Sequence, residues 1–220
     1  MDISEALYTT RAMRRLRPDP IPLDVQARIL DAAIRAPSEP NGRRFLLVDD
    51  PEIRRQLAAL YQEVWERFVD PSTIPPPFLR VFRSGDHLAK HFAEVPLLLI
   101  GFGQGNAGSS IFPSLQNAML AARAEGIGST LTTFLGSHQD KVLEILGVPP
   151  DEGWRMHACV PLGYPTGRWG IAPRRPAHEV TFRNRWGTPP GFEVSEPLWQ
   201  PEGEDGAERG TRPPDQMVVW

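Results

Sequence analysis

The sequence has one cysteine, two lysines and no long apolar run. The single cysteine, Cys159, cannot form a disulfide within the chain, which favours a reducing compartment. Runs such as residues 95–102 are too short to cross a bilayer, and the N-terminus shows no signal pattern. We therefore expect a cytoplasmic protein without a membrane partner. The formal net charge of -3 lacks the basic surplus of a nucleic-acid binder, so no nucleic-acid partner is expected either.

The composition is typical of a globular protein, and the C-terminal residues are acidic. A chain of 220 residues with 40% hydrophobic and 23% charged residues supports one full-sized core, with or without a tail. Residues 188–220 contain seven acids against two arginines, a net charge of -5, which leaves +2 for the preceding residues. This end is rich in Pro and Gly and has no sustained periodicity. We predict one domain, residues 1–187, and an extended or disordered tail, residues 188–220.

Apolar periodicity and Pro and Gly positions predict an alternation of helices and strands. Helices are expected at residues 2–9, 22–36, 51–68, 86–94, 113–125 and 140–146. Strands are expected at 44–48, 95–102 and 154–163, with 127–134 as strand or loop and 71–77 as an irregular excursion. The apolar run at 95–102 is typical of a strand that is buried on both faces.

Four arginines crowd into the stretch TRAMRRLRPDP, residues 10–20. Arg11 and Arg14 are three residues apart, so in a helical or turn conformation both side chains reach the same side. Converging guanidinium groups of this kind suit a terminal phosphate dianion. The alternative is a solvated basic face that pairs with neighbouring acids, and the spacing alone does not choose between the two.

Two further patterns indicate other kinds of site. GQGNAG, residues 103–108, matches the dinucleotide motif GxGxxG and follows a predicted strand. Against that reading, the next helix is expected to begin at Pro113, not at the third glycine, and the following strand does not end in an acid. His87 and His91 are four residues apart beside Glu94, but no second cluster supplies the remaining ligands of a metal site. We predict no metal.

Nucleophilic catalysis has no support, because no serine lies in a glycine elbow and no Cys–His pair is positioned by the sequence. No catalytic side chain is predicted, and cofactor chemistry is the better hypothesis. Polar groups beside apolar elements, such as Ser38 in APSEPN and Thr132 in GIGSTLTT, suit hydrogen bonds to a heteroaromatic ring. They equally suit helix caps and strand edges.

Four segments in this order resemble those of the nitroreductase family of FMN-dependent oxidoreductases. They are TRAMRRLRPDPIP, ILDAAIRAPSEPN, SLQNAMLAARAEGIGSTLTT and VPLGYPTGRWGIAPRRPAHEV. The resemblance covers roughly residues 1–187. It implies an α+β fold in which helices flank a mixed, largely antiparallel sheet, and an intertwined homodimer with FMN at the subunit interface.

The resemblance also implies a set of cofactor-binding residues. Arg11 and Arg14, with Arg174 or its neighbour Arg175, would hold the FMN phosphate. Ala12 and Met13 would contribute backbone contacts, and Pro37, Ser38 and Asn41 would face the flavin from the other subunit. Lys90 would approach the polar edge of the flavin, and its ring would be lined by Leu131, Thr132 and Thr133. By itself, Lys90 equally fits an ordinary surface lysine.

The function implied by the resemblance is an NAD(P)H-dependent flavin oxidoreductase. NAD(P)H would deliver hydride to flavin N5, and a nitroaromatic, quinone or other small acceptor would then take the electrons in a ping-pong mechanism. Ala12 stands where the family often has serine, and GRRF after Asn41 is shorter than the family pattern and lacks its tryptophan. These departures keep open a flavin-binding or storage protein without efficient turnover. A dinucleotide-binding protein built on GQGNAG is a third reading.

Overall fold

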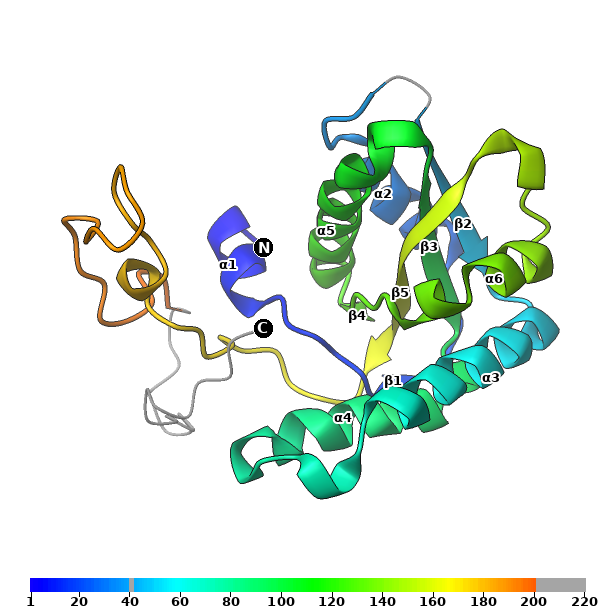
Figure 1. The fold of residues 1–220 in the computed structure, drawn as a ribbon, viewed down its shortest axis with the longest axis horizontal. Helices are drawn as coiled ribbons and strands as arrows, with labels where there is room; N and C mark the ends of the chain where they lie inside the picture. The colour runs from blue at the N-terminus through cyan, green and yellow to red at the C-terminus, as the bar shows by residue number, and fades with distance from the viewer. Residues whose placement is uncertain (40–41, 201–220) are drawn as a thin grey trace. The chain divides into compact units, whose positions relative to one another are not determined.

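The computed structural model describes residues 1–39 and 42–200 (Figure 1). Residues 11–168 form one compact unit, and residues 1–10 with residues 169–200 belong to another. Each unit is described below by itself. The boundary expected after residue 187 stays a prediction, and most of the expected acidic tail, from residue 201, lies outside the described residues.

The larger unit is built on an antiparallel sheet. Its strands are β1 (Leu16–Arg17), β2 (Arg43–Val48), β3 (Leu97–Gly103), β4 (Gly128–Ser129) and β5 (Arg155–Pro165). The strand order is β1-β5-β3-β2, with β4 also paired to β5, and every pair of named strands is antiparallel. An isolated parallel bridge joins Ala12 to Ser129. The predicted α+β class with a largely antiparallel sheet is therefore confirmed.

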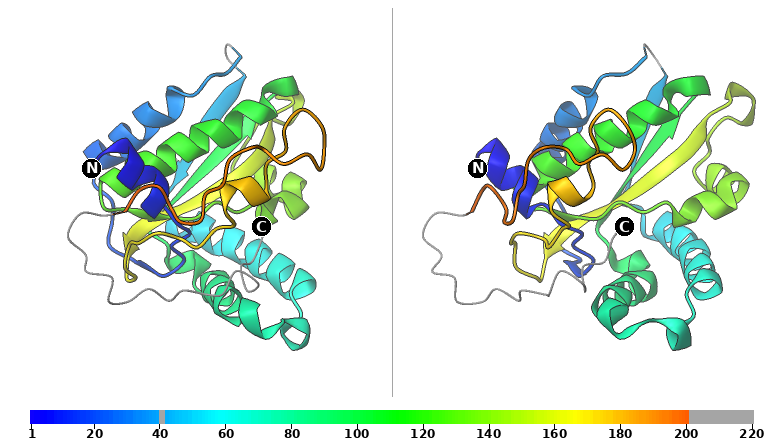
Figure 2. Two further views of the ribbon diagram at one scale, coloured as in Figure 1. Left: turned by 90° about the vertical axis from the view of Figure 1, so that its left-hand side faces the viewer. Right: turned by 60° about the vertical axis from the view of Figure 1, so that its left-hand side comes forward.

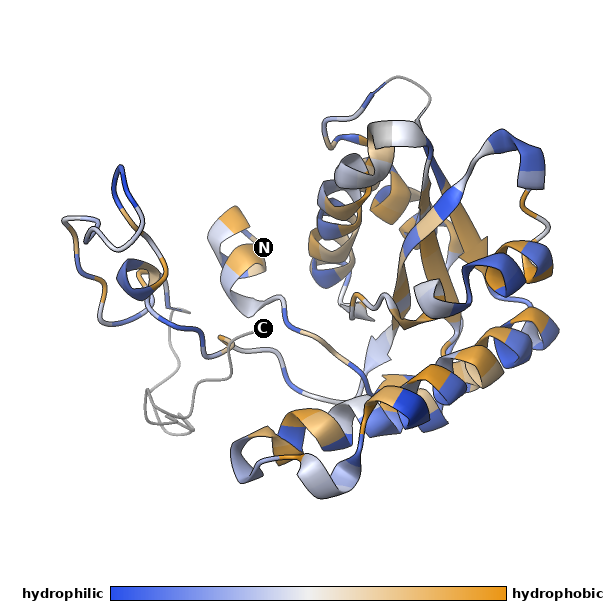
Figure 3. Cartoon of the chain, viewed as in Figure 1, coloured by the Kyte–Doolittle hydropathy of each residue, from blue (hydrophilic) through white to orange (hydrophobic). Residues whose placement is uncertain are grey.

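Helices cover both faces of this sheet (Figure 2). On one face lie α2 (Leu23–Ile34) and α5 (Gly108–Ala124), and on the other lie α3 (Pro51–Phe68), α4 (Leu79–Lys90) and α6 (Gln139–Ile145). Leu98 and Ile100 of β3 belong to the α3 side of the core, whereas Leu97 and Leu99 belong to the α2 side. This alternation follows the two-residue period of a strand, and it confirms that the apolar run is buried on both faces, as the hydropathy colours of β3 illustrate (Figure 3). None of the described helices has the length and apolar character needed to cross a membrane.

Helix α4 begins at Leu79, seven residues before the start expected from the sequence. The expected helix, residues 86–94, starts directly after Gly85. Instead, Gly85 is buried inside the helix, because the ring of Trp65 on α3 packs against it. A Cβ at this position would lie 2.4 Å from Trp65 Cη2, and the same indole stacks on Phe82 with 5.9 Å between ring centroids. The glycine allows two helices to approach closely.

Gly85→Ala is therefore expected to destabilise the protein. Overpacking costs about 1–3 kcal/mol, while alanine gains about 0.5–1 kcal/mol over glycine in a helix, so the free energy of unfolding should fall by roughly 1 kcal/mol. Denaturant unfolding measures the change. In a Trp65→Leu background, the same substitution should lose its penalty. A Gly85→Ala protein more stable than wild type would contradict the packing role.

Helix α5 begins at Gly108, so the expected start at Pro113 is wrong, and Pro113 lies inside the helix. The additional turn is stabilised by Ile111, which is fully buried and packs where Gly101 of β3 lacks a side chain. One argument against a dinucleotide motif in GQGNAG is thereby lost, but a stronger one replaces it. The dinucleotide fold requires parallel strands joined by a helix, and β3 is antiparallel to both of its neighbours.

The glycines of GQGNAG have a packing role instead. A Cβ on Gly108 would lie 2.4 Å from His157 Cε1, and one on Gly103 would lie 3.0 Å from His157 Nε2. The two glycines thus make room for a half-buried imidazole of β5. Burial lowers the pKa of His157, and the neighbouring Arg155 lowers it further.

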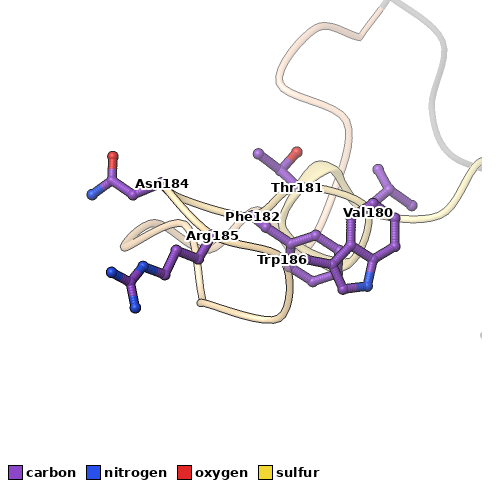
Figure 4. A pocket seen from close by; sticks show the side chains of 6 residues that line it. All are labelled: Val180, Thr181, Phe182, Asn184, Arg185 and Trp186. Carbon is purple, nitrogen blue, oxygen red and sulfur yellow. The ribbon is translucent and has the colours of Figure 1, made fainter.

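The smaller unit contains α1 (Ile3–Thr9). Asp2 caps its N-terminus, because the carboxylate of Asp2 accepts a hydrogen bond from the backbone N–H of Glu5. Its described residues include many exposed apolar side chains, among them Ile3, Leu7, Phe182, Trp186 and Leu198. Figure 4 shows Phe182 and Trp186, which line an open pocket with their ring centroids 4.8 Å apart. This pocket contains none of the predicted site residues.

Candidate cofactor site

The arginine stretch is bound to the edge of the sheet through β4. The backbone N–H of Met13 donates to the carbonyl of Ser129 at 2.8 Å, next to the bridge between Ala12 and Ser129. Two segments that are more than a hundred residues apart in the chain, TRAM and GIGSTLTT, are therefore brought together as the family resemblance implies. The side chain of Met13 is buried, while that of Ala12 is exposed.

Two glycines allow this crossing. Gly128 of β4 and Gly163 of β5 are partners in the sheet register. A Cβ on Gly128 would lie 3.0 Å from the Cβ of Met13, and one on Gly163 would lie 3.0 Å from the Cβ of Leu16. The absence of side chains at these positions lets the arginine stretch pass over the strands, and this is a physical reason for a glycine in both GIGST and PLGYP.

Arg14 points into the larger unit towards Tyr61. Its side chain is half-buried, and this burial lowers the pKa of the guanidinium. Among the described residues, no hydrogen bond or ion pair links Arg14 to another side chain, so its charge is left without a carboxylate partner. A half-buried cation of this kind favours an anionic ligand. Arg11 is also half-buried.

Tyr61, which interacts electrostatically with Arg14, is hydrogen-bonded to Thr132. Thr132 Oγ1 donates to the hydroxyl of Tyr61 at 3.2 Å, and both backbone hydrogen bonds of Thr132 go to Cys159 at 2.9 Å. Burial raises the pKa of Tyr61, while Thr132 and Arg14 oppose this shift. Burial likewise raises the pKa of Cys159. Tyr61 was not predicted as a site residue, because in the sequence it is one of several apolar positions at helical spacing in α3.

The other residues predicted to face the flavin ring occupy different environments. Leu131 is half-buried and packs against the α2 side of the core, whereas Thr133 is exposed. Lys90, in the last turn of α4, forms an ion pair with Asp86 at 2.8 Å. It also lines a groove between α3 and α4 together with Trp65. The lysine is thus both paired and accessible.

Helix α4 contacts the arginine stretch through a histidine. Arg15 Nη1 lies 3.1 Å from His87 Nδ1, and His87 stacks on His91 with 4.3 Å between ring centroids. His91 in turn contacts Glu94 at 2.8 Å. Within residues 1–39 and 42–200, no group of three or more potential metal-ligating side chains gathers around this pair or elsewhere. Burial lowers the pKa of His87, and Arg15 and His91 add to this effect.

Pro37 and Ser38 lie at the opposite end of the sheet from the arginine stretch. They follow α2, where Arg43 of β2 anchors the chain by donating to the carbonyl of Ala36 and to Ser114 Oγ, each at 2.8 Å. Arg43, on the Pro37 side, is the register partner of Gly103 at one end of β3. Ser129, which binds the arginine stretch, is the register partner of Leu162 in β5, and Leu162 is in turn the partner of Leu97 at the other end of β3. The intervening length of β3 is about 20 Å. Asn41 lies outside the described residues.

Arg174 and Arg175 belong to the smaller unit. Arg175 forms an ion pair with Glu179 at 3.1 Å, and Arg174 donates to the carbonyl of Pro173 at 3.0 Å. Their contribution to a phosphate site shared with Arg11 and Arg14 stays a prediction.

An antiparallel sheet with helices on both faces defines an α+β protein, and among the described residues Arg14, which is held next to β4, has no ion pair. The model of the nitroreductase family matches residues 7–164, and the chain belongs to this family. The family and fold predicted from the four segments are therefore confirmed.

Two curated relatives and one solved structure illustrate the similarity. The chain is 29% identical over 204 residues to a protein named NADH dehydrogenase from Thermus thermophilus, covering 83% of this chain and 96% of the relative. It is 26% identical over 186 residues to an NADPH-flavin oxidoreductase from Vibrio harveyi, covering 83% and 73%. A nitroreductase with bound FMN from Desulfitobacterium hafniense has the same fold, with a TM-score of 0.63, 20% identity, and coverage of 79% and 96%.

Proposed function

We propose that the protein is an FMN-dependent oxidoreductase that uses NAD(P)H as reductant. Membership of the nitroreductase family and the names of the two relatives, an NADH dehydrogenase and an NADPH-flavin oxidoreductase, support this function. When bound, the flavin would accept hydride at N5 and pass the electrons to a nitroaromatic, quinone or other small acceptor in a ping-pong cycle.

The observation that carries the proposal is the half-buried Arg14, which has no acidic partner within the described part of the chain and lies on a segment held at the edge of the sheet by Met13 and Ser129. The fit to a phosphate is good, because a guanidinium group donates in a fork that matches phosphate oxygens, and Arg14 has no ion pair with a carboxylate among residues 1–39 and 42–200. In the proposed site, Arg11 and Arg14 hold the FMN phosphate, with Arg174 or Arg175. Backbone groups of Ala12 and Met13 contribute nearby.

The remaining residues would orient the ring system. Thr132, fixed by Tyr61 and by its backbone bonds to Cys159, would present the segment Leu131–Thr133 to the flavin. Lys90 would stabilise negative charge on the polar edge of the reduced ring, as a cation does for any developing anion. Its ion pair with Asp86 keeps the ammonium group in place on α4.

The site would be completed by a second copy of the chain. Pro37 and Ser38 lie about 20 Å along the sheet from the arginine stretch, at the opposite end of the sheet of the larger unit. A homodimer in which Pro37, Ser38 and Asn41 come from the partner resolves this separation. The exposed apolar side chains of the smaller unit, such as Ile3 at 67% and Trp186 at 92% exposure, provide surface for such an interface.

The visible spectrum tests the function directly. Purified protein should be yellow, and its flavin should bleach anaerobically with NADH or NADPH and recover when a quinone is added. A flavin-storage protein would also be yellow, but nicotinamides would reduce its flavin no faster than free FMN. A colourless protein that takes up no FMN would contradict both functions.

A further inference from the structure

Helix α4 presents a row of basic side chains on its outer side. We define the basic face of α4 as Arg80, Arg83, His87 and Lys90, which recur every three or four residues and so share one side of the helix, together with His91 directly after the helix. All of them are exposed except His87, which is half-buried. The opposite side of the helix, with Gly85, Leu88 and Ala89, is buried. The basic face is therefore accessible to a ligand that binds the larger unit.

Two arginines of this face are electrostatically uncompensated. Within the part of the chain that the structure describes, the side chains of Arg80 and Arg83 form no hydrogen bond or ion pair. Three exposed arginines on or next to other helices do pair with acids, namely Arg28 with Asp24 and Glu125, Arg35 with Asp31, and Arg55 with Glu52, whereas Arg67 of α3 lies over the ring of Phe68. The first turn of α4 also has no acid, although the helix dipole disfavours a cation there. An anion bound on this face would compensate the charge of the two arginines and would interact favourably with the helix dipole.

The basic face is continuous with the proposed flavin site. Arg15, the neighbour of Arg14, contacts His87 at 3.1 Å. A guanidinium group only donates hydrogen bonds, so His87 Nδ1 accepts in this contact and the imidazole is neutral. Lys90 lies at one end of the face, at the position proposed for the polar edge of the flavin. The arginines lie farther along the helix, about 10 Å from Lys90 for Arg83 and about 15 Å for Arg80.

We infer that the basic face of α4 binds the phosphate groups of the reductant and selects NADPH over NADH. This inference rests on the proposed reduction of the flavin by a nicotinamide dinucleotide. With the nicotinamide at the flavin, the diphosphate lies near Arg15 and His87. The adenosine 2′-phosphate lies near Arg83 and Arg80. Because the 2′-phosphate is the only difference between the two coenzymes, these two arginines determine the selectivity.

The test compares the FMN-loaded wild type with the double variant Arg80→Ala/Arg83→Ala. The wild type should have a higher kcat/KM for NADPH than for NADH. In the variant, kcat/KM for NADPH should fall about 10- to 100-fold, as expected for the loss of one or two charge-assisted contacts, while kcat/KM for NADH stays within about twofold. The matched control is Arg35→Ala/Arg55→Ala, which removes the same charge from α2 and α3 and should leave both values unchanged.

A binding measurement provides a readout that does not depend on turnover. Adenosine 2′,5′-bisphosphate should bind the wild type in calorimetric titrations more tightly than AMP does, and the double variant should lose this difference. Wild-type preference for NADH, or equal losses for both coenzymes in the variant, would overturn the inference and assign the basic face to another anion. Failure of the proposed function is distinguishable, because then neither coenzyme would reduce bound flavin.

Discussion

Arg14→Ala is expected to lower the affinity for FMN about 10- to 100-fold, as expected for the loss of charge-assisted hydrogen bonds to a phosphate. The variant should nevertheless fold. Among the described residues Arg14 forms no hydrogen bond or ion pair with another side chain, and its half-burial lowers the pKa of the guanidinium, so its removal breaks no such bond and relieves the cost of burying a charge. Fluorescence titration of apo-protein with FMN measures the affinity, and thermal unfolding of the apo-protein measures the fold.

Arg17→Ala is the matched control, since Arg17 belongs to the same stretch but is exposed and pairs with Asp19 at 3.4 Å. It should bind FMN as the wild type does. Arg14→Lys should fall between the two, because lysine keeps the charge but cannot donate in the bidentate manner of arginine. Unchanged FMN affinity in Arg14→Ala would show that the phosphate site lies elsewhere.

Two inactive variants are expected to complement each other if each flavin is held by two subunits. Arg14→Ala and Ser38→Tyr place their defects in residues at opposite ends of the sheet. In a mixed dimer one site receives both defects and the other receives none. Co-expression at equal levels makes half of the dimers mixed, so about a quarter of the wild-type FMN content and activity should return.

Each variant alone should be folded, dimeric and depleted of FMN, which sedimentation and thermal unfolding establish. A doubly substituted chain, Arg14→Ala/Ser38→Tyr, co-expressed with Arg14→Ala, is the control, since no arrangement of these two chains restores an intact site. If the first pair recovers no more FMN than this control, both groups of residues act within one subunit and the proposed shared site is wrong.

Local residue patterns along the chain determine the type of most elements. The helix at 51–68 was predicted with the bounds found for α3, because Pro51 and the preceding Asp50 define its start and its apolar residues recur at helical spacing. The buried strand β3 was equally readable from its apolar run. The starts of α4 and α5 were missed, because packing of Gly85 on Trp65 and burial of Ile111 outweigh the local preferences of Gly and Pro.

Some features of the candidate site can likewise be predicted from local patterns, and others depend on the tertiary structure. The sequence by itself determined the family, the arginine stretch and the polar segment Leu131–Thr133, since these are contiguous motifs. Only the tertiary structure decided that Met13 binds Ser129, that Tyr61 supports Thr132 and that Pro37 and Ser38 lie far from Arg14. These are long-range relations set by strand register and by close packing at Gly128 and Gly163, and no local preference encodes them.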